Sequence, residues 1–86
     1  MRLDRPTSDG ERVVLYTGRG CHLCESARDT LDTEGVSYGE IDITGDPALE
    51  EAYREWLPVV EIDGERAFVY FVDPGALRRK VAQSPG

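Results

Sequence analysis

The sequence predicts one small α/β domain, in which a four-stranded mixed sheet is flanked by helices on both faces. Short apolar runs alternate with stretches whose apolar residues recur every three or four positions, in the order β-α-β-α-β-β-α. The helix between the first two strands implies that they are parallel, with a right-handed crossover. Asp63-Gly64 separates the last two apolar runs and is a strong signal for an antiparallel hairpin.

Length and charge restrict the class of protein. A chain of 86 residues forms one domain with short elements. We expect residues 1–11 to be a mobile leader and residues 12–86 to be the domain. The net charge of −7 disfavours nucleic acid and anionic membrane as partners. Neither a membrane-spanning run nor a signal peptide is recognisable, so we expect a cytoplasmic protein. We also expect it to work as a monomer.

The first half of the domain predicts strand, helix, strand. Residues 13–16 form an apolar run suited to a strand buried on both faces. A helix is predicted from Cys21 to about Glu34, with Gly35 at the position of a left-handed C-terminal cap. Residues 38–43 are predicted as the second strand. The apolar stripe of the helix is predicted to consist of Leu23, Ala27 and Leu31. Because Leu23 stands between the cysteines, it is also predicted as a surface or docking residue rather than a catalytic one.

The second half predicts a helix, a hairpin and a final helix. Asp46-Pro47 combines an N-cap acid with proline at the first helical position, and Pro58 ends that helix. Residues 59–62 and 66–71 are the two hairpin strands, and Asp73-Pro74 begins the last helix. The middle helix is predicted to carry an apolar stripe of Ala48, Leu49, Ala52, Tyr53 and Trp56, with Trp56 in the core.

The chain has two cysteines, and they stand three residues apart at the predicted start of a helix. Thiol–disulfide exchange needs an attacking thiolate and a second thiol that resolves the mixed disulfide. A helix N-terminus stabilises a thiolate, so Cys21 is the predicted nucleophile. Cys24, one turn further, is the predicted resolving thiol. His22 lies between them, either as a cation that favours the thiolate or as an ordinary exposed polar residue.

Several motifs together resemble a known family. Tyr16-Thr17 precedes Cys21-His22-Leu23-Cys24, Leu57-Pro58-Val59-Val60 follows downstream, and Asp63-Gly64 comes after it. In this combination the chain resembles the glutaredoxin-like proteins of the thioredoxin superfamily over about residues 12–82. The resemblance implies a thioredoxin-like fold, a thiol–disulfide oxidoreductase activity and a cis Pro58 beside the sulfurs. It also implies that the backbone of Leu57 pairs with an extended substrate.

The resemblance implies two electron sources, glutathione or a thioredoxin reductase, and no bound cofactor. Many glutaredoxins carry a lysine at the position of Gly18, and Arg19 lies one step away. The paired glycines and acids that bind glutathione in the family are replaced here by residues 72–75. Because glutathione carries two carboxylates that need cations or N–H donors, we expect weak specificity for it. Leu57-Pro58-Val59-Val60 also resembles redoxins that supply ribonucleotide reductase and are reduced by thioredoxin reductase.

The expected activity is reduction of disulfide-containing protein substrates, with mixed disulfides of glutathione as the second substrate class. The predicted substrate-binding residues are Arg19, His22, Leu57 and Pro58. Two alternatives stay open. The first is a non-catalytic metal or iron–sulfur carrier, which would need two chains to share ligands because a structural zinc site takes four. No metal site is predicted within one chain. The second is a thioredoxin-fold interaction module.

Overall fold

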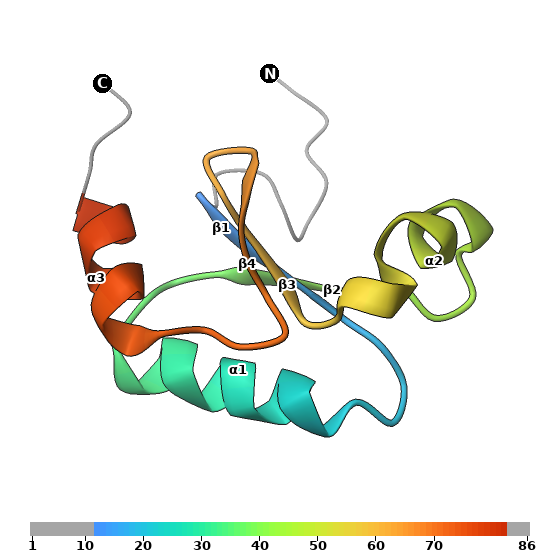
Figure 1. Cartoon of the computed structure of the whole chain (residues 1–86), viewed down its shortest axis with the longest axis horizontal. Coiled ribbons are helices and arrows are strands. Elements are labelled where there is room, and N and C mark those ends of the chain that lie inside the picture. The colour runs from blue at the N-terminus through green and yellow to red at the C-terminus, as the bar shows by residue number, and fades with distance from the viewer. Residues whose placement is uncertain (1–11, 83–86) are drawn as a thin grey trace, which may run out of the picture.

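The computed structural model describes residues 12–82 of the chain, so the expected leader, residues 1–11, lies outside the described residues. The elements follow the predicted order (Figure 1). They are β1 (Val13–Thr17), α1 (His22–Thr33), β2 (Gly39–Asp42), α2 (Pro47–Tyr53), the 3₁₀ helix η1 (Arg54–Trp56), β3 (Val59–Ile62), β4 (Glu65–Val69) and α3 (Pro74–Ala82).

The four strands form one mixed sheet in the order β2-β1-β3-β4. β1 and β2 are parallel, whereas β3 is antiparallel to both β1 and β4. The register places Thr17 opposite Asp42, Tyr16 opposite Val59, and Val59 opposite Val69. The ends of β1, β2 and β4 and the start of β3 therefore meet at one end of the sheet, and the loops that continue from them are neighbours there.

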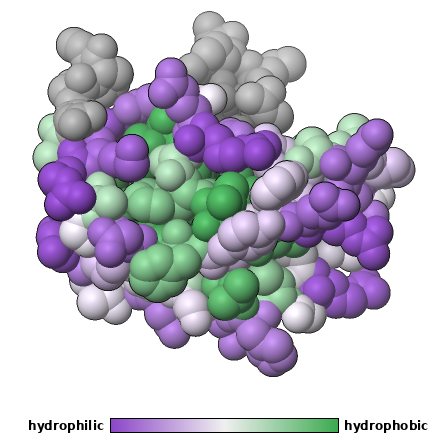
Figure 2. All heavy atoms as spheres, in the orientation of Figure 1, coloured by the Kyte–Doolittle hydropathy of each residue, from purple (hydrophilic) through white to green (hydrophobic). Residues whose placement is uncertain are grey.

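The helices lie on both sides of the sheet, as predicted. In Figure 1, α1 runs below the strands, α3 stands at the left and α2 lies at the right. Figure 2 shows apolar atoms gathered in the middle of this face, where the β3–β4 ribbon and the segment leading to α3 lie in Figure 1, with charged residues around them. Within residues 12–82, the helices are too short and too polar for any of them to cross a membrane.

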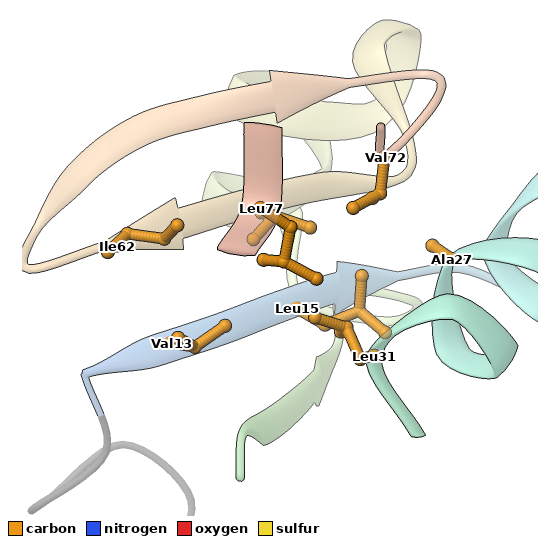
Figure 3. Packing of buried hydrophobic residues seen from close by; sticks show 8 residues of the cluster. Val13, Leu15, Ala27, Leu31, Ile62, Val72 and Leu77 are labelled. Carbon is orange, nitrogen blue, oxygen red and sulfur yellow. The ribbon is translucent and has the colours of Figure 1, made fainter. Parts of the chain in front are cut away.

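The main core lies between one face of the sheet and helices α1 and α3 (Figure 3). Leu15 of β1, Leu31 of α1 and Leu77 of α3 are fully buried, and they bring all three elements together. Burial of a leucine side chain contributes about 1.5–3 kcal/mol. The remaining members of this cluster are Val13, Ala27, Val60, Ile62 and Val72.

The opposite face of the sheet contacts α2 through a pair of tyrosines. The rings of Tyr16 and Tyr53 stack with centroids 4.2 Å apart, and both hydroxyls donate to the carboxylate of Glu61, at 3.3 and 2.8 Å. Burial raises the pKa of Tyr16, so its phenol stays protonated as a donor. α2 itself has no fully buried residue, and its predicted apolar stripe is wrong for Ala48 and Ala52, which are exposed, whereas Leu49 and Tyr53 are half-buried. Helix α2 is held mainly by the stacked Tyr53.

Two residues predicted on apolar helix stripes lie on the surface. Leu23 is 50% exposed because Cys24 takes the inward position of the first turn of α1, so the buried stripe is Cys24, Ala27 and Leu31. Trp56 is 41% exposed, which corrects its predicted core position. The helix tightens to a 3₁₀ turn after Tyr53, and this turn changes the direction of the side chains that follow.

Strand β4 is shorter than predicted. It ends at Val69, because Tyr70 has a φ of 69° and the Phe71 N–H donates to the Val69 carbonyl at 2.7 Å. A hydrogen bond that spans three residues in this way is a γ-turn. The turn leaves Phe71 64% exposed instead of within a strand.

The local signals at the other turns are confirmed. Asp63 and Gly64 both have positive φ, 54° and 83°, as a two-residue hairpin of the I′ type requires. The Asp46 carboxylate accepts the Leu49 N–H at 3.2 Å, and the Asp73 carboxylate accepts the Ala76 N–H at 2.7 Å. Both aspartates therefore cap the helices they were predicted to begin.

Truncating a core leucine of α1 tests this packing. Leu31→Ala should lower the free energy of unfolding by about 2–5 kcal/mol, because it leaves a cavity in the main core. Leu23→Ala, on the exposed side of the same helix, should change it by less than about 0.5 kcal/mol. Urea unfolding followed by circular dichroism measures both values. Equal losses in the two variants would contradict the burial of Leu31 and the exposure of Leu23.

Candidate redox-active site

The two cysteines lie at the start of α1 and are joined as a disulfide, with their Cα atoms 5.2 Å apart. Cys21 is the N-cap residue, with an extended backbone at φ −94° and ψ 104°. The backbone N–H of Cys24 donates to Cys21 Sγ at 3.1 Å, so this sulfur occupies the place of a capping oxygen. Cys21 is partly exposed, whereas Cys24 is 1% exposed. Cys24, one turn inside the helix, is therefore the less accessible of the two cysteines.

The sheet register brings the predicted site residues to one end of the domain. The loop that leads to Cys21 follows β1, and Leu57-Pro58 directly precedes β3, which pairs with β1 at that end. The Leu57–Pro58 peptide bond is cis, as the family resemblance implied. Pro58 is buried, and its carbonyl accepts the Tyr70 N–H at 2.9 Å. The segment after β4 is thereby fixed beside Pro58.

Gly18 and Leu57 approach each other closely. A Cβ atom built on Gly18 would lie 2.6 Å from Leu57 Cδ1. Any larger residue at this position, lysine included, would require the Leu57 side chain to move. Glycine at position 18 thus leaves room for the side chain of Leu57, the residue that precedes the cis proline.

A small pocket of about 180 Å³ lies next to this contact and is lined by residues from the loops after β1 and β2, from α2 and η1, and from the segment before β3. Arg19 lies at its edge, and the Arg19 N–H donates to Thr44 Oγ1 at 3.0 Å. Arg54, at the end of α2, is the second cation of the pocket, and no sequence signal pointed to it or to Thr44. Arg19 and Arg54 bring two positive charges to this pocket, and Glu50, whose carboxylate accepts the Gly45 N–H at 2.8 Å, brings one negative charge. The other lining residues are Gly18, Ile43, Glu50 and Leu57.

His22 is the first residue of α1 and is exposed, as predicted. Of the predicted site residues, the structure therefore joins Cys21 and Cys24 in a bond and places Arg19 at the edge of a pocket that Leu57 also lines. A larger pocket of about 530 Å³, which Arg12, Val36 and Val81 help to line, contains none of the predicted site residues.

An ion pair connects α1 to the strands that carry the site. Arg28 donates to both carboxylate oxygens of Glu40 in β2, at 3.0 and 2.6 Å. Thr17, at the end of β1, also donates to this carboxylate, at 3.3 Å. The hydrogen bond from Arg28 lowers the pKa of Glu40. Helix α1 is thus attached to β2 by a charged pair as well as to β1 by core packing.

Aromatic residues gather at this end of the sheet; the sequence offered Trp56 for the site but favoured the core for it, with no signal for Tyr70 or Phe71. Trp56 and Tyr70 are exposed and their rings are in contact, with centroids 6.0 Å apart. Phe71 follows Tyr70 and is the most exposed of the large apolar residues within residues 12–82. The apolar run 67–72 is followed at once by Asp73-Pro74, which begins a helix. The chain therefore needs a turn within the run, and this was the signal in the sequence that the strand stops early.

The arrangement can support redox chemistry of the two sulfurs. In the part of the chain that the structure describes, His, Cys, Asp and Glu side chains do not gather in groups of three or more that could hold a metal ion. A metal carrier built on Cys21 and Cys24 would therefore need ligands from outside residues 12–82, for example from a second chain. The fold and the bonded cysteine pair define a thioredoxin-like protein whose two thiols are placed to form a disulfide.

Comparison with known proteins supports this class. The family model of the Glutaredoxin-like domain (DUF836) matches residues 12–82, and the chain belongs to this family. The uncharacterized protein Rv0508 of Mycobacterium tuberculosis is 30% identical over 82 residues, which cover 85% of this chain and 84% of that protein.

Solved structures confirm the thioredoxin-like fold. Protein XcR50 from X. campestris is 30% identical, with a TM-score of 0.74 over 85% of this chain and 99% of that chain. The glutaredoxin-like protein NrdH-redoxin from Escherichia coli has a TM-score of 0.65 at 23% identity, over 86% of this chain and 99% of that chain. The likeness to NrdH-redoxin is one of fold.

The ion pair between Arg28 and Glu40 predicts a dependence of stability on pH. Because the folded state lowers the pKa of Glu40, the pair stabilises the protein above the ordinary glutamate pKa of about 4.5, and this contribution is lost as pH falls through the lowered pKa. The two side chains are 37% and 34% exposed, so solvent screening limits the contribution to about 1 kcal/mol or less.

Arg28→Ala should therefore lower the free energy of unfolding at pH 7, and its difference from the wild type should shrink below pH 4. Urea unfolding at a series of pH values measures this. Arg79→Ala, which removes an exposed arginine from α3, is the matched control. A difference for Arg28→Ala that stays constant down to pH 3 would show that side-chain packing, not charge, accounts for the loss.

Proposed function

We propose that this protein is a thiol–disulfide oxidoreductase in which Cys21 is the nucleophile and Cys24 the resolving thiol. One observation carries the proposal: the partly exposed Cys21 sulfur caps the N-terminus of α1 and is bonded to the buried sulfur of Cys24. The positive end of the helix dipole and the Cys24 N–H directed at Cys21 Sγ both favour a thiolate at Cys21 in the reduced protein.

The reaction begins with the reduced protein. The Cys21 thiolate attacks one sulfur of a substrate disulfide, the substrate S–S bond breaks, and the other substrate sulfur leaves as a thiolate that takes up a proton. Cys24 then loses its proton and attacks Cys21 Sγ. The mixed disulfide breaks, the second substrate thiol is released, and the Cys21–Cys24 disulfide forms. Two electrons have passed from the protein to the substrate.

The residues around the disulfide are assigned to binding of the substrate. Leu57 has an extended backbone, with φ −62° and ψ 144°, which suits pairing with an extended substrate segment. Pro58 lacks an N–H group and its carbonyl already accepts the Tyr70 N–H, so Leu57 is the backbone that remains for such pairing. Arg19 and His22 are exposed on the two sides of Cys21 and supply polar contacts to the substrate.

The substrates we propose are disulfide-containing proteins, with glutathione mixed disulfides as the weaker class. A donor of two electrons must return the Cys21–Cys24 disulfide to the thiols. Two molecules of glutathione or a thioredoxin reductase are the two donors that fit the family resemblance. This cycle requires a reducing compartment, so we place the protein in the cytoplasm.

Turnover tests the proposal directly. Wild-type protein should reduce the disulfides of insulin with NADPH and a thioredoxin reductase, or with glutathione and glutathione reductase, as the electron source. Cys21→Ser should abolish turnover, because it removes the attacking sulfur. Cys24→Ser should lower turnover of insulin at least tenfold while still forming a mixed disulfide. Arg79→Ala should behave as the wild type.

Absence of turnover with both donors would overturn the proposal. A visible absorption spectrum with bound iron or zinc in freshly purified protein would favour the carrier alternative instead. If the thiols are inert and no metal is bound, the interaction module becomes the better description.

The proposed roles of the two thiols predict different rates of alkylation as a function of pH. The thiol of Cys21, measured in Cys24→Ser, should be alkylated by iodoacetamide with an apparent pKa below the ordinary value of about 8.5. The buried thiol of Cys24, measured in Cys21→Ser, should react more slowly near neutral pH. Mass spectrometry of the alkylated protein gives both rates. Faster reaction of Cys24 would reverse the assignment.

A further inference from the structure

We propose that three residues on the face of the sheet opposite the main core position the substrate-binding segment of the site. They are Tyr16, Tyr53 and Glu61, and we call them the tyrosine cluster. The cluster holds the backbone of Leu57 at the place where an extended substrate bound at Cys21 pairs with it. This inference rests on the function proposed above and deepens it, because it predicts which substrates depend on the cluster.

The contacts within the tyrosine cluster join three elements. The rings of Tyr16 in β1 and Tyr53 in α2 stack at an interplanar angle of 14°, with centroids 4.2 Å apart. Both hydroxyls donate to the carboxylate of Glu61 in β3, at 3.3 and 2.8 Å. All three residues are half-buried, where hydrogen bonds to a charged acceptor are stronger than in water. Burial raises the pKa of both phenols, so they remain donors to the shared carboxylate.

Strand β4 adds a cation to the cluster. Arg66 stands opposite Glu61 in the sheet register, and its guanidinium Cζ lies 5.3 Å from the centroid of the Tyr53 ring. A cation over an aromatic ring is attracted by the negative face of the ring. An aromatic stack, a hydrogen bond and a cation–π contact therefore fix one side chain of a helix that has no fully buried residue.

The two tyrosines stand shortly before the two parts of the site. Tyr16 precedes Cys21 by five positions, and Tyr53 precedes Leu57 by four. The 3₁₀ helix η1, drawn in yellow in Figure 1, joins Tyr53 to the Leu57–Pro58 bond and β3. Because the two rings stack on each other, the chain that leads to the nucleophile and the chain that leads to the substrate-pairing residue are fixed to each other.

The segment around Leu57 is attached on both sides. After it, Pro58 is buried, and its carbonyl accepts the Tyr70 N–H at 2.9 Å. Before it, the Tyr70 hydroxyl donates to the Glu55 carbonyl of η1 at 3.1 Å, but this bond is exposed and water competes for it. The half-buried tyrosine cluster is the sheltered attachment on this side, so it sets where η1 begins.

The position of the pairing residue matters for one class of substrate. A peptide held by backbone hydrogen bonds to Leu57 must also present its sulfur to Cys21, so the distance between these two residues decides whether both contacts form. A misplacement of about 1 Å in a positioning group lowers a rate about a hundredfold. Small disulfides without backbone amides do not use this pairing. The ratio of the rates for the two substrate classes therefore reports on the cluster.

A matched pair of substrates tests the proposal. The extended substrate is a peptide whose cysteine forms a disulfide with mercaptoethanol, and the small substrate is hydroxyethyl disulfide. Tyr53→Ala should lower kcat/KM for the peptide about tenfold more than for hydroxyethyl disulfide, through a higher KM. Tyr53→Phe, which keeps the ring stack and removes the bond to Glu61, should lower the ratio of the two values about threefold.

Tyr38→Ala is the matched control. Tyr38 is also half-buried, but it packs against the main core on the other face of the sheet. Its loss should lower stability and leave the substrate ratio within about twofold of the wild type. Equal changes of the ratio in Tyr53→Ala and Tyr38→Ala would trace to stability and would overturn the proposal. If circular dichroism shows that Tyr53→Ala does not fold, Tyr53→Phe and Tyr38→Phe give the same comparison.

The shared carboxylate predicts that the substitutions are not additive. Glu61→Gln keeps the size of the side chain and removes the charged acceptor, so it should lower the substrate ratio about threefold. In the Glu61→Gln protein, Tyr53→Phe should then change the ratio by less than about twofold, because its hydroxyl has already lost the charged partner. Fully additive effects would show that the two residues act separately and would overturn the cluster as a unit.

Trp56 reports on the segment without turnover, because it is the single tryptophan of the chain and lies in η1 between Tyr53 and Leu57. Release of η1 in Tyr53→Ala should raise the acrylamide quenching constant of Trp56 about twofold, and Tyr38→Ala should match the wild type. Equal quenching in all three proteins would overturn the positioning role. If the wild type reduces neither substrate, the oxidoreductase proposal fails, while the quenching still decides whether the cluster holds this segment.

Discussion

The packing of α1 against β1 is the constraint on which the site depends. Ala27 and Leu31 fix the helix on the sheet, and Cys24 continues the same buried stripe toward the N-terminus. Because Cys24 points inward, Cys21 must lie at the open end of the helix, where its sulfur caps the first turn. Packing of this helix face thus buries the Cys24 sulfur and leaves the Cys21 sulfur, to which it is bonded, at the accessible end of the helix. The ordinary geometry of a helix start is enough to produce this arrangement.

The sheet topology brings the other residues of the site together at one end of the domain. Because β3 is antiparallel to both of its neighbours, its first residue meets the last residues of β1 and β4. The cis proline, the loop before Cys21 and the γ-turn at Tyr70 are therefore neighbours although they are far apart in the chain. The bond from the Tyr70 N–H to the Pro58 carbonyl makes two of these loops one unit.

Charge distinguishes the two sides of this site. The chain is acidic overall, with a net charge of −7, yet Arg19 and Arg54 line the small pocket on the Gly18 side. On the other side, Asp73 uses its carboxylate to cap α3. The residue that caps this helix also carries a negative charge two positions after the exposed Phe71 in the chain.

The sequence by itself determined the order of the elements, the hairpin at Asp63-Gly64, the caps at Asp46 and Asp73 and the position of the cysteine pair. Each of these depends on neighbours within a few residues, so local patterns suffice. Whether Trp56 and Phe71 are buried was decided by the tertiary structure, because a 3₁₀ turn and a γ-turn redirected them away from the faces that their periodicity indicated. The cis bond at Pro58 was expected only from the family resemblance. The contacts between Gly18 and Leu57, and between Tyr70 and Pro58, arise from strand register, which no local pattern in this chain encodes.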